Sequence, residues 1–323
     1  MDFPYLDSAD TPQIAALWLR NNYAPAVPRT QLIEHIRWKY DSRRAVIYSQ
    51  REEGRIFATT GYLKGSFCNG NSIFSIGWGM DSLIDEPLRD GRVFAFMRVL
   101  RSTMRSAEHE ILVAFANKNV HDTYLRIGFQ PWNGFFFYQA KLQAGMVLPV
   151  RPDRGFDLLW KDELDVSGAE ALFRRTQGFY QGISPRDKEY LDWRYGQCPF
   201  RRHVFLHVYR QRVLVGYCAV RFVLQPESRT GYIVDLLDSP DDDAVLEVML
   251  LELMARCRQR EIAQIETVLT NGRISQGLLR CGFFRQQQET VLVWLKSDRA
   301  RRFFEQGSTG MHLTMSDGDY DME

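Results

Sequence analysis

The sequence predicts a mixed α/β (α+β) protein built from two homologous domains in tandem. Three observations lead to this fold class. The chain has 323 residues, more than one hydrophobic core usually serves. Short sequence landmarks recur once along the chain at a nearly constant offset. Helical and strand-like segments follow each other in the same order in both halves.

The landmarks of this repeat are short and lie far apart within each half. They are IRWKY at 36–40 with LDWRY at 191–195, Gly61-Tyr62 with Gly216-Tyr217, and LRIGF at 125–129 with LRCGF at 279–283. The first two pairs are offset by 155 residues and the third by 154. We do not expect unrelated segments to stay in step over about ninety residues, and we interpret the halves as copies of one domain.

The first copy reads as two helices, three strands, a long helix, a strand, a short helix and a final strand. Apolar residues at helical spacing, and apolar runs bounded by turn residues, support this order. The predicted ranges are helices 11–23 and 29–40, strands 45–49, 55–64 and 72–80, helix 92–105, strand 111–116, helix 120–127 and strand 135–139. Gly128 stands where a helix commonly ends in a left-handed residue.

The second copy repeats this order, and the predicted domain boundaries follow from it. Its elements are strands 204–209, 212–222 and 231–237, helix 243–257, strand 264–269, helix 274–279 and strand 291–295. We therefore predict a first domain at 1–142, a linker rich in Gly and Pro at 143–165, a second domain at 166–298 and an acidic tail at 299–323. Alternating Asp317, Asp319 and Asp321 predict that the tail is either solvated or bound at an interface.

Composition excludes several classes of protein. Lys plus Arg number 41 against 40 Asp plus Glu, so no overall field attracts nucleic acid or anionic lipid. Apolar runs are too short or too interrupted to cross a membrane, and residues 1–10 lack a basic segment before an apolar one, so we expect a cytoplasmic protein. Five scattered cysteines and six histidines show no metal-ligand spacing, so no metal is expected.

One segment of the first half carries a motif that is similar to that of a known family. Asn117, Tyr124 and Gly128-Phe129, at the end of the first copy's order of elements, resemble the last motif of the GNAT acyltransferase superfamily. The resemblance covers both halves, and W-[KR]-Y before each sheet is similar to two-domain GNAT proteins of bacteria. It implies acyl transfer from acetyl-CoA or another acyl-CoA, as co-substrate, to an amine by direct attack. The expected acceptor is a small molecule: an amine, amino sugar or amino acid.

The resemblance also assigns the residues that would bind the co-substrate. Residues 87–92 are similar to the family's Pro-x-x-Arg-Gly-x-Gly turn, although one glycine is missing and an Asp is inserted. A helix N-terminus suits a pyrophosphate because its free N–H groups and dipole favour anions. Arg89, Gly91 and Arg92 are therefore the candidate phosphate-binding residues. The alternative is a polar loop with exposed arginines.

Three further residues are candidates for the chemistry itself. Tyr124 matches the family's general acid, whose proton would go to the departing CoA sulfur; the alternative is a ring packed under the sheet. Asn117 is either a ligand of the acyl-CoA or a helix N-cap. Asp81, at the end of the strand before the phosphate turn, is the candidate base, with a solvated carboxylate as the alternative.

The second copy is predicted to be degenerate. Leu278 replaces the tyrosine, and Pro240 is followed by three aspartates and no glycine where the first copy has its phosphate turn. Carboxylates at a helix N-terminus would cap the helix and repel a pyrophosphate. We expect one CoA per chain, bound to the first half. Two alternative functions remain open: an aminoacyl-transferase using charged tRNA, like the tandem-GNAT peptidoglycan enzymes, and a non-catalytic binding or scaffold module.

Overall fold

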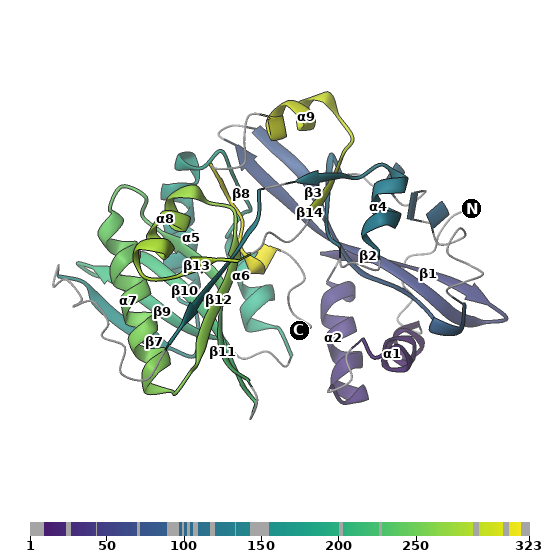
Figure 1. Ribbon diagram of the computed structural model, residues 1–323, viewed down its shortest axis with the longest axis horizontal. Coiled ribbons are helices and arrows are strands. Elements are labelled where there is room, and N and C mark those ends of the chain that lie inside the picture. Colours follow the sequence, from purple (N-terminus) through teal and green to yellow (C-terminus); the bar gives the residue numbers. More distant parts are fainter. Residues whose placement is uncertain are drawn as a thin grey trace.

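The computed structural model is a mixed α/β fold in which two sheets lie side by side, each with helices packed against it (Figure 1). The structure describes residues 10–23, 27–42, 44–69, 72–88, 97–98, 100–101, 104–105, 109–116, 120–132, 134–142, 155–199, 203–225, 228–286, 291–305 and 310–317. Within these residues, no helix is long and apolar enough to span a membrane.

Among the described residues, the first half has the predicted order of elements with one short strand, β5, added. They are α1 (Thr11–Arg20), α2 (Arg29–Asp41), β1 (Ala45–Glu52), β2 (Arg55–Asn69), β3 (Ser72–Ile84), β4 (Ile111–Phe115), α4 (His121–Ile127), β5 (Gln130–Trp132) and β6 (Phe136–Lys141). In the predicted helix 92–105, those residues that are described are helical. Strand β2 runs to Asn69 and β3 to Ile84, further than predicted, because the two strands pair from Ala58 with Ile84 to Asn69 with Ser72.

The second half contains the predicted elements and several more. They are β7 (Asp157–Lys161), α5 (Val166–Thr176), β8 (Gly182–Ile183), α6 (Lys188–Leu191), β9 (Val204–Arg210), β10 (Val213–Gln225), β11 (Ser228–Asp238), α7 (Asp243–Gln259), β12 (Gln264–Leu269), α8 (Gly272–Arg280), β13 (Phe284–Arg285), β14 (Val291–Leu295), α9 (Asp298–Glu305) and β15 (Met311–His312). The bounds predicted for β12 and β14 are confirmed. The segment predicted as linker, 143–165, contains β7, which pairs with β9 at the sheet edge.

The last strand of each half lies in the sheet of the other half. Among the described strands, the first sheet has the order β15-β8-β2-β3-β4-β14-β5, with β1 also paired to β2, and the second has the order β13-β6-β12-β11-β10-β9-β7. Strand β14 separates β4 from β5, and β6 separates β12 from β13. The predicted boundaries at 142 and 166 therefore divide the sequence but not the sheets.

The repeated W-[KR]-Y motif lies where the two halves meet. The indole rings of Trp38 and Trp193 stack with centroids 4.7 Å apart and planes inclined by 11°. Trp38 Nε1 donates a hydrogen bond to the Trp193 carbonyl oxygen at 3.0 Å, and Trp193 Nε1 donates to the Trp38 carbonyl oxygen at 3.3 Å. Such reciprocal contacts are those of two copies related by an approximate twofold axis. The motif is thus a contact between the halves.

Each sheet buries both of its faces. One face of the first sheet packs on α1 and α2, and this core also takes in Val234, Val268 and Met315 from the second half. The opposite face packs on α4 through residues that include Leu112 and Tyr124. In the second sheet, α7 and α8 cover one face and α5 covers the other.

The Gly-Tyr landmark is a match in sequence that the structure does not support. A Cβ added to Gly61 would lie 2.8 Å from the Tyr40 hydroxyl, on the face covered by α1 and α2. A Cβ added to Gly216 would lie 2.8 Å from Val245 Cγ1, on the face covered by α7. Successive residues of a strand face opposite sides. The two glycines therefore occupy different positions, and this landmark is wrong as a structural equivalence.

Of the two predictions for the tail, solvation is wrong for residues 311–317, which lie buried against the rest of the chain. Every residue from Met311 to Asp317 is buried. Strand β15 extends the first sheet by pairing with β8. The carboxylate of Asp317 is therefore not solvated.

Candidate active site

Two parallel strands of the first sheet separate where the predicted site residues lie. Strands β3 and β4 pair from Ile76 with Ile111 to Gly79 with Ala114, and β3 then continues to Ile84 without β4. Gly79 permits their close approach, because a Cβ there would lie 3.3 Å from the Val113 carbonyl oxygen. In open sheets, ligands bind beyond the carboxyl ends of parallel strands. Residues 80–84, beyond the last pair of β3 and β4, therefore lie where a ligand could bind.

Tyr124 is held on α4 against this edge. Gly128 ends α4 with φ of 108°, the left-handed conformation that the sequence predicts. The chain can then turn so that the ring of Phe129 packs edge-on against Tyr124, with centroids 4.8 Å apart. The Tyr124 hydroxyl lies 3.2 Å from Ser82 Oγ, either oxygen being able to donate. A second hydroxyl, Thr60 Oγ1, lies 2.9 Å from Ser82 Oγ.

The environment of Tyr124 keeps its proton in place. Its side chain is buried, which raises the pKa of the phenol above its ordinary value, although the hydrogen bond with Ser82 lowers it. A phenol that stays protonated can donate a hydrogen bond or its proton to a departing thiolate. Because a thiol is a stronger acid than a phenol, complete transfer of the proton is uphill, and burial of the phenol does not assist it. The geometry therefore allows both the catalytic and the packing role.

Asp81 lies beside Ser82 but has different partners. Its φ of 53° is unusual for a residue with a side chain, and it falls where β2 and β3 shift register. Its carboxylate accepts hydrogen bonds from Tyr40 and Tyr23 and pairs with Lys39 Nζ at 3.1 Å. These groups come from α2 and the segment between α1 and α2, on the face opposite Tyr124. Because both members of the ion pair are buried, this carboxylate is neither solvated nor unpaired.

The start of the predicted phosphate turn is fixed by Asp85. Burial raises the pKa of this carboxyl, but hydrogen bonds from Arg20 and Asn21 and the charge of Arg55 hold it below its ordinary value. A cavity of about 360 Å³ adjoins this carboxylate, lined by Glu52, Glu53, Arg55, Phe57, Asp85, Pro87 and Leu88. The predicted cofactor residues Arg89, Gly91, Arg92 and Asn117 lie outside the described residues.

Sequence reasoning missed Ser82, Lys39 and Tyr40. The W-[KR]-Y repeat contained the signal for two of them, because Lys39 and Tyr40 belong to that landmark and both contact Asp81. Nothing in the local sequence distinguishes Ser82 from other strand serines. Among the described residues, no group of three or more His, Cys, Asp or Glu side chains could hold a metal ion.

In the second half, the residues that correspond to Tyr124, Asn117 and the phosphate turn contact other parts of the protein. Leu278 is fully buried in the core beneath α8. Asp242 caps α7, accepting a hydrogen bond from the Ala244 amide at 3.0 Å, as the sequence predicts for this acidic turn. Asn271 caps α8 by accepting from the Ile274 amide at 3.1 Å. This second-half asparagine is thus an N-cap, which is one of the two predicted roles for Asn117.

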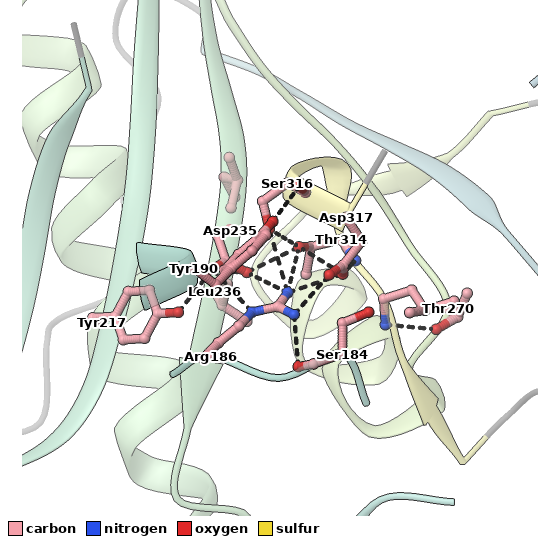
Figure 2. A network of polar contacts seen from close by, with 12 residues as sticks. Ser184, Arg186, Tyr190, Tyr217, Asp235, Leu236, Thr270, Thr314, Ser316 and Asp317 are labelled. Carbon is pink, nitrogen blue, oxygen red and sulfur yellow. Dashed lines mark hydrogen bonds and ion pairs between the residues drawn. The ribbon is translucent and has the colours of Figure 1, made fainter. Parts of the chain in front are cut away.

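A buried ion network surrounds Asp235, which follows Asp81 by the 154-residue offset of the repeat. Figure 2 shows the Arg186 guanidinium between Asp235 and Asp317. Its Nη1 donates to Asp317 at 2.6 Å and its Nη2 to Asp235 at 3.0 Å. The Tyr217 hydroxyl donates to Asp235 at 2.7 Å. The carboxylate at this offset is therefore neutralised in both halves, by Lys39 in the first and by Arg186 in the second.

This network predicts a loss of stability in acid. Burial raises the pKa of Asp235, but the charge and hydrogen bonds of Arg186 outweigh it and lower the pKa to about 2. The pKa of this carboxyl is lower in the folded protein than in the unfolded chain, where it is near 4, so the ionised carboxylate stabilises the fold above pH 4. This stabilisation is of the order of 2 kcal/mol and is lost as the pH falls toward 2. We expect the Tm to fall over this range. Thermal unfolding followed by circular dichroism at pH 2–5 measures it.

Two substitutions test whether Asp235 causes this dependence of the Tm on pH. Asp235→Asn should lower the Tm at pH 5 and flatten its dependence on pH below 4, because the titrating group is gone. Asp192→Asn, at a half-exposed pair with Lys188, should leave the slope unchanged. Equal slopes in the wild type and Asp235→Asn would show that Asp235 does not cause the acid sensitivity.

Comparison with known proteins identifies the fold. No protein-family model matches the sequence, and no curated protein matches it. A tandem GNAT protein from the clavulanic acid biosynthesis pathway is 14% identical, with a TM-score of 0.63 over 92% of this chain and 98% of that one. A GCN5-related N-acetyltransferase from Anabaena variabilis is 9% identical, with a TM-score of 0.68 over 92% of this chain and 73% of that one.

A third solved structure has a similar fold. A probable N-acyltransferase from Enterococcus faecalis is 10% identical, with a TM-score of 0.65 over 93% of this chain and 73% of that one. The chain therefore has the GNAT acyltransferase fold. More particularly, it has the fold of a tandem GNAT protein, because the match to the tandem structure extends over nearly the whole of both chains.

Proposed function

We propose that the chain is an acyl-CoA-dependent N-acyltransferase of the cytoplasm. Its first half carries the active site, and its acceptor is a small amine, amino sugar or amino acid. The observation that carries the proposal is the buried Tyr124 hydroxyl beside Ser82, at the edge where β3 and β4 separate. The nearly balanced charge of the chain supports an acceptor other than nucleic acid or a membrane surface.

In the proposed reaction the neutral acceptor nitrogen attacks the thioester carbonyl of the acyl-CoA. A C–N bond forms as the C–S bond breaks, and the departing thiolate takes the proton of Tyr124. The attacking nitrogen loses a proton, which returns the phenolate to the phenol through solvent or the base. Arg89, Gly91, Arg92 and Asn117 would bind the CoA moiety, the arginines through charge-assisted hydrogen bonds to its phosphates.

Asp81 is the proposed base, acting through its neighbours. Its side chain is fully buried, so a proton from the acceptor would reach it through the Tyr23 hydroxyl, which donates to it at 3.1 Å. Lys39 holds the Asp81 carboxylate in place through their buried ion pair at 3.1 Å. In this arrangement Lys39 is a positioning residue.

A second candidate function is a non-catalytic binding module. The buried Lys39–Asp81 ion pair favours it, because this carboxylate is already bound by a cation and two tyrosine hydroxyls of the protein itself. Such a module would bind a CoA thioester or another ligand and release no thiol. The two functions therefore differ in turnover and not in binding.

Acyl-CoA binding and thiol release together test the proposal. Acetyl-CoA at a hundred times its Kd should stabilise the protein by about 2.7 kcal/mol, and the Tm measures this. Release of free CoA thiol with a panel of small amines, amino sugars and amino acids measures turnover. Stabilisation without thiol release would favour the binding module. No stabilisation by acetyl-CoA or longer acyl-CoAs would refute both the enzyme and an acyl-CoA-binding module.

The phosphate turn gives a separate prediction. Gly91→Asp would add a side chain and a negative charge where the pyrophosphate is proposed to bind. We expect titration calorimetry to show about tenfold weaker CoA binding or more, because the added carboxylate would repel the pyrophosphate. The matched control is Gly178→Asp, at an exposed glycine of the second half with open space around it. Equal affinity in Gly91→Asp and the wild type would place the CoA elsewhere.

A further inference from the structure

The second half has a pair of separating parallel strands like that of the first. Strands β11 and β12 pair from Thr230 with Gln264 to Tyr232 with Glu266. Beyond this point β11 continues to Asp238 and β12 to Leu269. Backbone groups on the facing edges of separated strands need other partners when they are buried.

Residues 310–317, which we call the strap, supply such partners at the end of β12. Thr270 follows this strand, and its amide donates to the Leu313 carbonyl oxygen at 3.2 Å. Its hydroxyl donates to the Met311 carbonyl oxygen at 3.0 Å and accepts from the Leu313 amide at 3.0 Å. The strap is thus hydrogen-bonded through its backbone, as an extended peptide ligand would be.

The strap also contacts β11, on the other side of the separation. The Thr314 hydroxyl donates to Asp235 Oδ1 at 2.9 Å. Asp317 and Asp235 share the Arg186 guanidinium, which also donates to the Thr314 and Ser316 hydroxyls (Figure 2). Contacts with both separated strands place the strap across the space between them.

The strap is bound on its outer side as well. It pairs with β8, the Gln181 amide donates to the Gly310 carbonyl oxygen at 2.8 Å, and the Tyr190 hydroxyl donates to the Ser316 carbonyl oxygen at 2.6 Å. Met311, Leu313 and Met315 are buried in the core that both halves share. The position is therefore fixed by both sheets and not by the ion network alone.

We infer that the strap is a built-in ligand of the second half, which closes the separation of β11 and β12 to any other ligand. The argument from contacts is independent of the proposed function, which enters only in naming acyl-CoA as the excluded ligand. A bound CoA would have to displace a segment whose residues from Met311 to Asp317 are all buried. Displacement would leave Arg186 without Asp317 and expose three apolar side chains.

Hydrogen exchange of the intact chain tests the inference. In the wild type, the amides of Leu313, Thr314 and Thr270 should exchange as slowly as those in the centre of the second sheet. Asp317→Asn removes one charge from the Arg186 contacts, and we expect exchange in 310–317 and at Thr270 to rise about tenfold or more. Exchange at the centre of β10 and β12 should stay within about twofold of the wild type.

Two controls keep the test decisive. Asp192→Asn changes a half-exposed carboxylate that directly follows α6, and it should leave the exchange rates of the strap amides unchanged. If Asp317→Asn does not fold, Thr314→Val, which removes the hydrogen bond to Asp235, replaces it. Fast exchange of the strap in the wild type would overturn the inference. So would a uniform loss of protection across the second sheet in the variants, because it would show general destabilisation.

Calorimetry with CoA separates this inference from the proposed function. One equivalent of CoA per chain agrees with both, and we expect this result. Two equivalents per chain would overturn the strap as a closure of the second half. No binding at all would refute the acyl-CoA proposal, and the exchange measurements would still decide the strap.

Discussion

A chain that ends at residue 145 is expected to form no stable, soluble first half. Without β14, strands β4 and β5 lose the partner that joins them, because β14 pairs with β4 from Val291 to Leu295. Strand β6 would keep its apolar residues and lose β12, its own partner. An unpaired strand edge of this kind promotes aggregation. Yield in the soluble fraction, size-exclusion chromatography and circular dichroism measure the outcome.

Expression of both fragments together is the matched control. Residues 1–145 and 146–323 together contain all strands of both sheets, so the exchanged strands can join two separate chains. We expect the fragments to copurify as a one-to-one complex with a cooperative thermal transition. A monomeric 1–145 fragment that unfolds cooperatively by itself would show that the exchange of β6 and β14 is not required for folding.

The order of elements could be predicted because it depends on local sequence. Gly128 ends α4 in a left-handed conformation that few other residues adopt without strain, so its position fixed the end of the helix. Short runs of strand-forming residues bounded by turn residues gave β12 and β14 their bounds. The patterns around 111–115 and 264–269 likewise predicted strands, and the structure places each beside a parallel neighbour.

The exchange of strands could not be predicted from the sequence. Since the halves are copies of one domain, β6 and β14 present similar apolar edges, and either could pair with β4 or β12. The choice depends on the path of the chain between the elements and on contacts such as the stacked Trp38 and Trp193. Local pattern carries no information about which of two homologous partners a strand will meet.

Of the predicted site residues, Tyr124 and Asp81 lie among the described residues, and their roles stay predictions. Tyr124 and Gly128 belong to one motif, and the structure places Tyr124 at the edge of β3. The partner of Asp81 was missed because Lys39 lies 42 residues earlier and meets it only after folding. The Gly-Tyr landmark failed because a shift of one residue moves a strand side chain to the opposite face.

Tyr124→Phe is expected to lower turnover about a hundredfold or more while CoA binding is kept, which is the range of general acid catalysis. The ring and its contact with Phe129 remain, and only the hydroxyl beside Ser82 is lost. Because the thiolate would then leave without a proton donor, the loss should appear in kcat and not in the Kd for CoA. Thiol release and titration calorimetry measure the two quantities.

A second tyrosine on the same face of the first sheet separates chemistry from stability. Tyr62 is also buried, and its hydroxyl lies 3.3 Å from that of Tyr48, so Tyr62→Phe removes a buried hydroxyl contact of the same kind. Either substitution should lower the free energy of unfolding by about 1 kcal/mol, the usual value for one hydrogen bond. Only Tyr124→Phe should lower kcat. If both variants keep full turnover, or both lose it equally, Tyr124 is a packing residue and the proton donor must be sought elsewhere.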